Sequence, residues 1–259
     1  MRDLIDMWGN TRMVVLTAMS ASLYAAILIP FKVLPIIPGV TELRPANAVP
    51  VVCSFLFGPA AAWGAAIGNV IGDFFGGLGP GDMFGFVGNF LYGFIPYRAW
   101  ELLSGDDPVP RSVGAWIKFV VVVAIASGAC ATTVGWGLNL LGFIPFRVLG
   151  NIVMFNNMAA SLLLAPFLLS VIYPRAKRGR LLYRDVMAQP RAVSTARRRV
   201  GLLIVATAAF GGVVVGNLLS SGTLHPAFLP HSTGGTDAAA VGFGLLPVMA
   251  LMALGVLLI

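Results

Sequence analysis

The chain has 259 residues, of which 58% are apolar and 10% are charged, and its mean hydropathy is +0.89. Soluble domains carry about 25% charged residues, and disordered chains are poor in large apolar residues, so the composition excludes both classes. Two cysteines are also too few to staple a small secreted domain, and we therefore predict an integral membrane protein.

The apolar stretches are continuous and rich in Gly and Ala, which is typical of packed membrane helices rather than of a β-barrel. Because a helix needs about 20 residues to cross a bilayer, the length allows eight spans. We predict an all-α integral membrane protein with spans at 14–30, 45–57, 60–75, 83–103, 114–141, 148–173, 200–219 and 238–259. Only Gly58 and Pro59 separate the short second span from the third. These two spans are expected to form a tight hairpin in which one helix is tilted, broken or re-entrant.

The net charge of +7 comes mainly from one segment, because nine of the 17 Lys and Arg residues lie at 175–199, with Asp185 as the single acid. Such a segment is typical of a cytoplasmic loop attracted to anionic lipid, and nucleic-acid binding is not expected. This orientation puts the amino terminus in the cytoplasm and leaves only Lys32, Arg44 and Arg147 outside. The segment at 174–199 also divides the chain into a six-helix body at 1–173 and a two-helix appendix at 200–259.

Polar side chains gather where these spans meet the outer side. A charged side chain at the centre of a membrane helix costs roughly 2.5–3.5 kcal/mol, so its position is informative. Asn69 and Asp73, for example, are four residues apart and share one helix face. We predict an outward-opening binding pocket that contains Glu42, Arg44, Asn47, Asn69, Asp73, Asn89, Trp136, Asn139, Arg147 and Asn151, with Asp82 and Asn156 at the same end. The alternative is that these groups only cap helix ends and meet headgroups.

Aromatic residues lie at the same end of the predicted bundle, namely Phe74, Phe75, Phe86, Trp136, Phe143 and Phe155. Singly, each is typical of the aromatic belt of a membrane protein. Together with mixed charges they indicate a small ligand with a flat ring and hydrogen-bonding edges. The outer side has three acids and three bases, which makes a strongly anionic or polycationic substrate less favoured.

Two rows of small residues follow the first span. Ala18, Ser22 and Ala26 form one row at a spacing of four residues, and Ala21 and Ala25 form another beside it. Small residues at this spacing allow close helix contact, either inside the bundle or with a partner membrane protein.

Motifs of catalysis are absent from the sequence, which contains no GxxxxGK[ST], HExxH or GxSxG. The chain therefore has no phosphate-binding loop for ATP hydrolysis, and we expect no catalytic residue, cofactor or metal. Cys53 and Cys130 lie singly in apolar spans and are expected to pack there. For His225, His231 and Asp237 in the outer loop of the appendix, contact with solvent is favoured over metal binding.

The stretch at 42–103 resembles the substrate-binding S components of energy-coupling-factor uptake transporters, most specifically in RPAN at 44–47 and GNVIGD at 68–73. The resemblance covers about residues 1–175. It implies a six-helix protein that captures a vitamin or related metabolite from outside, with 42–47 in gating and ligand contact. It also implies docking through Ala18, Ser22 and Ala26 onto a transmembrane T component driven by two cytoplasmic ATPases. The basic segment and the last two spans are not part of the usual six-helix body.

Two alternatives from other classes are a stand-alone secondary carrier or channel and a membrane enzyme. A carrier would have polar residues running through to the inner side, whereas here they stop near the middle of the membrane. The ligand is left open among riboflavin, thiamine precursors, a deazapurine and a corrinoid. We expect the appendix to lie outside the binding site, tethered beside the body without tight packing.

Overall fold

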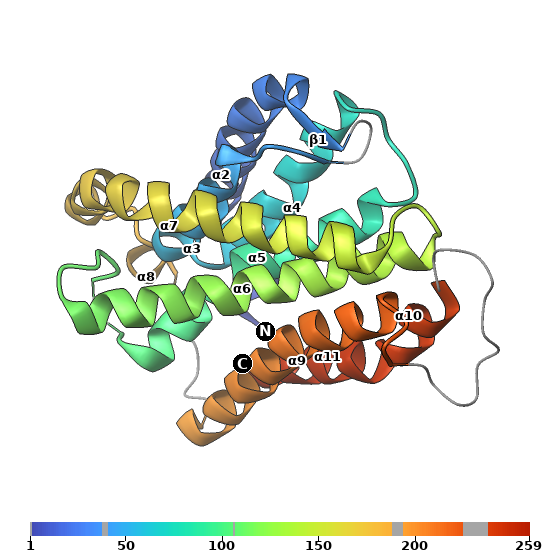
Figure 1. The fold of residues 1–259 in the computed structure, drawn as a ribbon. Coiled ribbons are helices and arrows are strands. Elements are labelled where there is room, and N and C mark those ends of the chain that lie inside the picture. Colours follow the sequence, from blue (N-terminus) through green and yellow to red (C-terminus); the bar gives the residue numbers. More distant parts are fainter. Residues whose placement is uncertain (1, 38–40, 106, 188–193, 225–237) are drawn as a thin grey trace.

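The computed structural model describes residues 2–37, 41–105, 107–187, 194–224 and 238–259, and most of these are helical (Figure 1). The helices are α1 (Asp3–Asp6), α2 (Thr11–Leu28), α3 (Ala48–Phe57), α4 (Pro59–Phe74), α5 (Asp82–Leu103), α6 (Val113–Leu140), α7 (Phe146–Arg178), α8 (Tyr183–Val186), α9 (Thr195–Ser220), α10 (Ala238–Gly244) and α11 (Leu246–Leu258). Short 3-10 turns lie at η1 (Met7–Gly9), η2 (Ile29–Val33) and η3 (Pro45–Asn47). Strands β1 (Pro35–Ile37) and β2 (Thr41–Glu42) pair antiparallel in the connection between α2 and α3.

The all-α membrane fold is confirmed. Five described segments are long and apolar enough to cross a bilayer: Thr11–Val33, Val113–Leu140, Phe146–Val186, Thr195–Ser220 and Ala238–Leu258. The predicted spans at 45–57, 60–75 and 83–103 correspond to α3, α4 and α5, of which α3 has 10 residues and α4 has 16. A total of eight membrane crossings therefore stays a prediction.

The turn between α3 and α4 is as tight as its sequence indicates. Gly58 is the single residue between the two helices and has a φ of +52°, a conformation that glycine adopts without steric cost. A Cβ on Gly58 would lie 2.7 Å from Cγ of Tyr183, so the ring of α8 rests directly on this turn. The basic segment that follows α7 is thereby in contact with the body.

Close contact between α2 and α4 depends on small residues. A Cβ on Gly64 would lie 2.4 Å from the Ser20 Cβ, and one on Gly68 would lie 2.8 Å from the Ala21 carbonyl oxygen. Of the two small-residue rows in α2, the row with Ala21 and Ala25 therefore packs inside the bundle. The row of Ala18, Ser22 and Ala26 is exposed on its surface.

The C-terminal hairpin, which we define as α9, α10 and α11, packs against α6 and α7 (Figure 1). The Thr132 hydroxyl on α6 donates to the Ala209 carbonyl at 3.1 Å, and Trp136 Nε1 donates to the Gly242 carbonyl at 2.9 Å. A Cβ on Gly212 would lie 2.4 Å from a side-chain carbon of Thr132, which shows how near the two backbones come. The expectation of an appendix without tight packing is wrong. Small residues on α9 allow its backbone to approach α6 closely, and the hydropathy of the sequence gives no sign of this contact.

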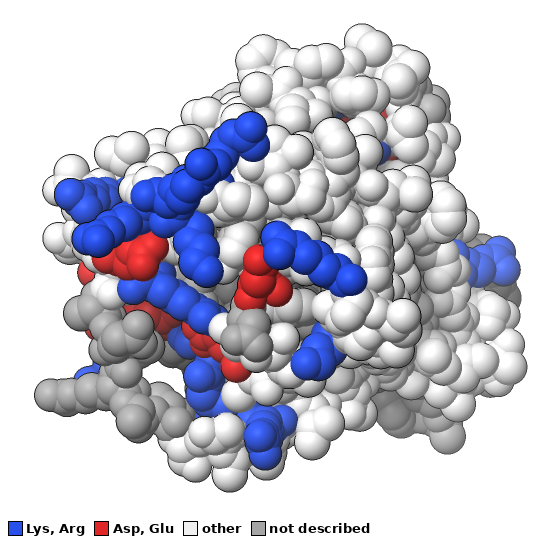
Figure 2. Space-filling model, turned by 90° about the vertical axis from the view of Figure 1, so that its left-hand side faces the viewer, with Lys and Arg blue, Asp and Glu red and all other residues white. Residues whose placement is uncertain are grey.

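Charged residues are concentrated at the end of the bundle where α7 ends and α9 begins (Figure 2). The buried Arg98 pairs there with Asp3, and Glu101 pairs with Arg198 and accepts from the Tyr183 hydroxyl at 2.6 Å. These contacts join the amino-terminal residues, α5, α8 and α9. The two charges near the end of α5 are tolerated because each has a partner of opposite sign.

Candidate ligand-binding site

A cavity of about 420 Å³ opens at the opposite end of the bundle. This volume lies within the range of about 300–1,000 Å³ typical of sites for small organic molecules. Its polar lining comes from the residues before α3 and from α4, α5 and α7. Its apolar lining comes from α6, α7 and the connection between them. The polar residues are Arg44, Asn47, Asn69, Asp73, Asp82, Asn89, Asn156 and Asn157, and the apolar ones include Val134, Leu138, Phe143, Leu149 and Val153.

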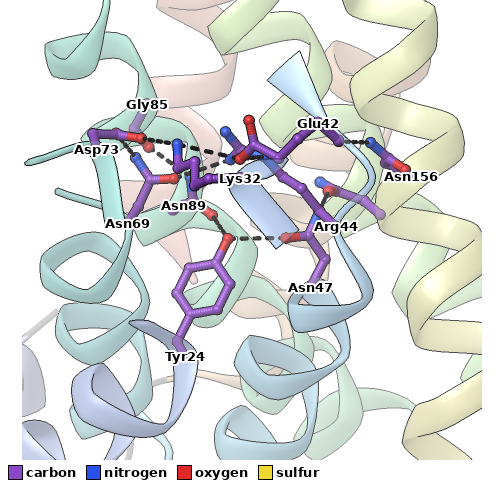
Figure 3. Close-up of polar contacts among 11 residues, drawn as sticks. Tyr24, Lys32, Glu42, Arg44, Asn47, Asn69, Asp73, Gly85, Asn89 and Asn156 are labelled. Carbon is purple, nitrogen blue, oxygen red and sulfur yellow. Dashed lines mark hydrogen bonds and ion pairs between the residues drawn. The ribbon is translucent and has the colours of Figure 1, made fainter. Parts of the chain in front are cut away.

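Four charged residues form an alternating strip beside and within this cavity (Figure 3). Lys32 Nζ lies 3.1 Å from Asp73 Oδ1 and 3.2 Å from Glu42 Oε1. Arg44 Nε lies 2.9 Å from the same Glu42 oxygen, and Arg44 Nη1 donates to Asn69 Oδ1 at 3.2 Å. Asn69 Nδ2 in turn donates to Asp73 Oδ2 at 2.6 Å. The contacts of the four charged residues and Asn69 therefore form a closed ring.

The strip is largely removed from water, and its opposite charges lie within ion-pair distance of one another. Burial acts to lower the pKa of Arg44, but the Glu42 carboxylate offsets this, so the pKa lies above its ordinary value. Asp82 adds a further carboxylate to the cavity wall and accepts from the Gly79 backbone N–H at 2.8 Å. Lys32 and Arg44 thus stand against three carboxylates, which favours a neutral or singly positive ligand over an anion.

A second set of contacts, which we call the amide row, consists of Tyr24, Asn47, Asn89 and Asn157. The Tyr24 hydroxyl lies 2.9 Å from Asn47 Oδ1 and 3.0 Å from Asn89 Oδ1, and its single proton serves one of them at a time (Figure 3). Asn47 Nδ2 donates to Asn157 Oδ1, while Asn89 Nδ2 donates to the Gly85 carbonyl at 2.9 Å. The row therefore joins α2, η3, α5 and α7 beneath the cavity.

Five of the ten predicted pocket residues line the cavity together: Arg44, Asn47, Asn69, Asp73 and Asn89. Glu42 lies directly behind them, held by Lys32 and Arg44, and its backbone carbonyl accepts from Asn156 Nδ2 at 2.9 Å. The connection between α2 and α3 thus brings its charged residues onto α4.

The other four predicted residues do not line the cavity, because they face the C-terminal hairpin or the α6–α7 connection. Trp136 donates to the carbonyl of Gly242 in α10, and Asn139 Oδ1 accepts from the backbone N–H of Phe146 at 2.7 Å. The backbone N–H of Arg147 donates to Ser220 Oγ at 3.2 Å, and Asn151 exchanges amide hydrogen bonds with Asn217 in α9. Their contacts place them on helix faces other than those that line the cavity.

Of the predicted aromatic set, Phe143 lines the cavity. Phe74, Phe75 and Phe155 are exposed on the outside of the bundle, as expected of belt residues. Within the described ranges, no group of three potential metal ligands occurs. His225, His231 and Asp237 lie outside the described residues.

Three contributors to the site escape the sequence analysis. In the sequence, Tyr24 is only one residue of a predicted apolar span, and Lys32 is only one of the three predicted outer bases. Asn157 is not singled out. The signal for Asn157 is present, since Asn156 and Asn157 are adjacent amides inside an otherwise apolar helix. No pattern in the sequence indicates that Lys32 belongs to the site, because only the fold of the α2–α3 connection brings it to Asp73.

Residues 14–174 match the family model described as QueT transporter. No curated protein and no solved structure matches the chain. The matched residues run from the start of α2 to near the end of α7 and include every residue that lines the cavity. The basic segment and the C-terminal hairpin lie beyond the match.

Proposed function

Since the chain belongs to the QueT transporter family, an S-component family of the energy-coupling-factor type, we propose that it captures a queuosine precursor from the outer side of the membrane. The proposed ligand is a 7-deazaguanine base, one of the ring-containing metabolites that the sequence leaves open. The membership also removes the membrane enzyme as an alternative, because this is a family of transporters.

The observation that carries the proposal is the cavity of about 420 Å³ with an amide-rich wall. A guanine-like base is flat and presents both donors and acceptors along its edges. An asparagine amide also presents one acceptor and two donors, so a wall with five asparagines suits such an edge. Phe143 and the apolar side chains of α6 and α7 offer contact to the ring faces. The site has three carboxylates and two basic groups, so a positively charged substituent on the base is acceptable there.

Uptake requires an energy source that this chain does not contain, since it has no phosphate-binding loop. We propose that a T component and two cytoplasmic ATPases supply it. The exposed row of Ala18, Ser22 and Ala26 on α2 is the proposed docking surface, because small residues let a partner helix approach closely.

The proposed orientation puts the amino terminus and the basic end in the cytoplasm, which leaves the cavity on the outer side. Nine Lys and Arg residues at 175–199 then lie at the inner leaflet, where anionic lipid attracts each by about 1 kcal/mol at low salt. Cysteine accessibility in whole cells, measured at Gly79 and Lys177 after substitution, tests this orientation.

Binding of 7-deazaguanine to the purified protein, measured by isothermal titration calorimetry in detergent, tests the ligand. We expect saturable binding at one site. Adenine is the competitor, because it has a similar fused ring but carries an amino group in place of the ring carbonyl, lacks the 2-amino group and has nitrogen at position 7. Equal binding of both bases, or of neither, contradicts the proposed ligand.

A stand-alone carrier is the second candidate, and uptake in proteoliposomes separates it from an S component. We expect no ATP-dependent uptake of radiolabelled 7-deazaguanine by the purified chain alone, and uptake once the T component and ATPases are co-reconstituted. Gradient-driven uptake by the chain alone favours the carrier instead.

A further inference from the structure

Asn157 is a buried amide with one hydrogen-bonding group left over. Its side chain lies on α7, lines the cavity and is 3% exposed. Oδ1 accepts from Asn47 Nδ2, whereas Nδ2 has no hydrogen-bond partner. The neighbouring Cys130 thiol is at most a weak acceptor and leaves that donor unsatisfied. A buried donor without a partner is costly, and where it lines a cavity a bound molecule can supply the missing acceptor.

The amide row determines which end of Asn157 is left over. Turning the Asn157 amide by half a turn would set its Nδ2 against Asn47 Nδ2, so two donors would face each other. In the structure Asn47 is oriented with its Oδ1 toward the Tyr24 hydroxyl, which can donate to it. The Tyr92 hydroxyl, 3.0 Å from the Asn157 backbone carbonyl, fixes this part of α7 as well. With Asn47 in this orientation, the unpaired group of Asn157 is a donor.

We propose that Asn157 is a specificity-determining residue whose Nδ2 donates a hydrogen bond to an acceptor atom on the edge of the bound ring. The identity of that ring as a 7-deazaguanine rests on the proposed function. In such a base the acceptors are the ring carbonyl oxygen and the unprotonated ring nitrogen, and both lie at the ring edge. A ligand that presents a donor at this point leaves two N–H groups facing each other and is rejected.

The test uses Asn157→Leu, with Asn139→Leu as its matched control. Asn139 is 1% exposed, its Oδ1 accepts from a backbone N–H and its Nδ2 is also unpaired, but it does not line the cavity. Leucine has nearly the shape of asparagine and adds no buried charge. Isothermal titration with 7-deazaguanine is expected to show binding weakened roughly tenfold or more for Asn157→Leu, and changed less than about threefold for Asn139→Leu.

Thermal unfolding of both variants in the same detergent separates binding from folding. If Asn157→Leu does not fold, Asn157→Asp provides the second variant, since it keeps the oxygen that Asn47 contacts and replaces the donor with a carboxylate oxygen. Asn139→Asp, which adds the same charge at a buried position, is then its control. Equal loss of binding in the two positions, or wild-type affinity in a folded variant at 157, overturns this inference alone. Wild-type protein that does not bind 7-deazaguanine overturns the proposed ligand, and this inference falls with it.

Discussion

At the scale of single residues, the site is a set of opposite charges and amides that satisfy one another across four helices and a connection. Lys32 contacts both Glu42 and Asp73, so the connection between α2 and α3 is fastened to α4 by charge. Removing one partner from such a set leaves the others without compensation, because little water reaches them. Each charged residue therefore contributes to the shape of the cavity as well as to its surface.

Asp73→Asn tests this dual role. The substitution keeps the shape and removes the charge, so we expect 7-deazaguanine binding to weaken by roughly 1.5–3 kcal/mol, the range for a lost charge-assisted hydrogen bond. Asn151→Ala is the control, since that polar residue lies at the same end but contacts α9. Calorimetry measures the affinities, and unchanged affinity in Asp73→Asn contradicts the assignment of Asp73 to the site.

At the scale of elements, sequence patterns predict where helices lie better than which way their faces point. The clustering of Arg44, Asn69 and Asp73 is visible in the sequence because polar residues in apolar spans are rare. Trp136 and Asn151 are misplaced because they satisfy themselves against the C-terminal hairpin, whose packing on α6 and α7 has no hydropathy signal. The glycines of α4 and α9 mark the places of close helix contact, but which helix they contact is known only from the structure.

The α2–α4 contact gives a stability prediction. Gly68→Val places side-chain atoms against the Ala21 carbonyl, and we expect a loss of about 1–3 kcal/mol from overpacking. Gly211→Val on α9 is the control, because no atom lies within 4 Å of a Cβ built there. Thermal unfolding in detergent compares the two, and an equal melting temperature for both variants contradicts the close contact.

The exposed row on α2 gives a docking prediction. Ser22→Leu is expected to abolish co-purification with the T component and ATPases, because a large side chain separates the helices, while ligand binding by the isolated chain is kept. Thr207→Leu makes a similar change at an exposed position of α9 and should leave complex recovery unaffected. Normal recovery with Ser22→Leu shows that the partner docks elsewhere.

At the scale of the whole molecule, the chain joins a body that matches its family with a hairpin that lies beyond the match. The body contains every residue lining the cavity, and the hairpin contributes packing and the Asn151–Asn217 contact. The division at 174–199 stays a prediction, although α7 continues to Arg178 and Tyr183 is built into the body. A natural place to end a shortened chain is therefore after Met187 rather than after Tyr173.

A chain of residues 1–187 is expected to fold and to bind 7-deazaguanine within about threefold of the full chain, since the cavity stays intact. Its melting temperature should fall, because α6 loses the contacts of Thr132 and Trp136 with the hairpin. Calorimetry and thermal unfolding measure the two effects separately. A stable short chain without binding shows that the hairpin shapes the cavity from behind.

The packing of α9 on α6 also sets an order for biosynthesis. Ala209 follows Thr132 by 77 residues, which a ribosome adds in about 4–15 s at typical rates of translation. During those seconds the Thr132 hydroxyl has no Ala209 carbonyl to meet, and a carbonyl one turn earlier in its own helix is the acceptor within reach. The nascent body must hold together in the bilayer through this interval, and the arriving hairpin then exchanges that local bond for one between helices.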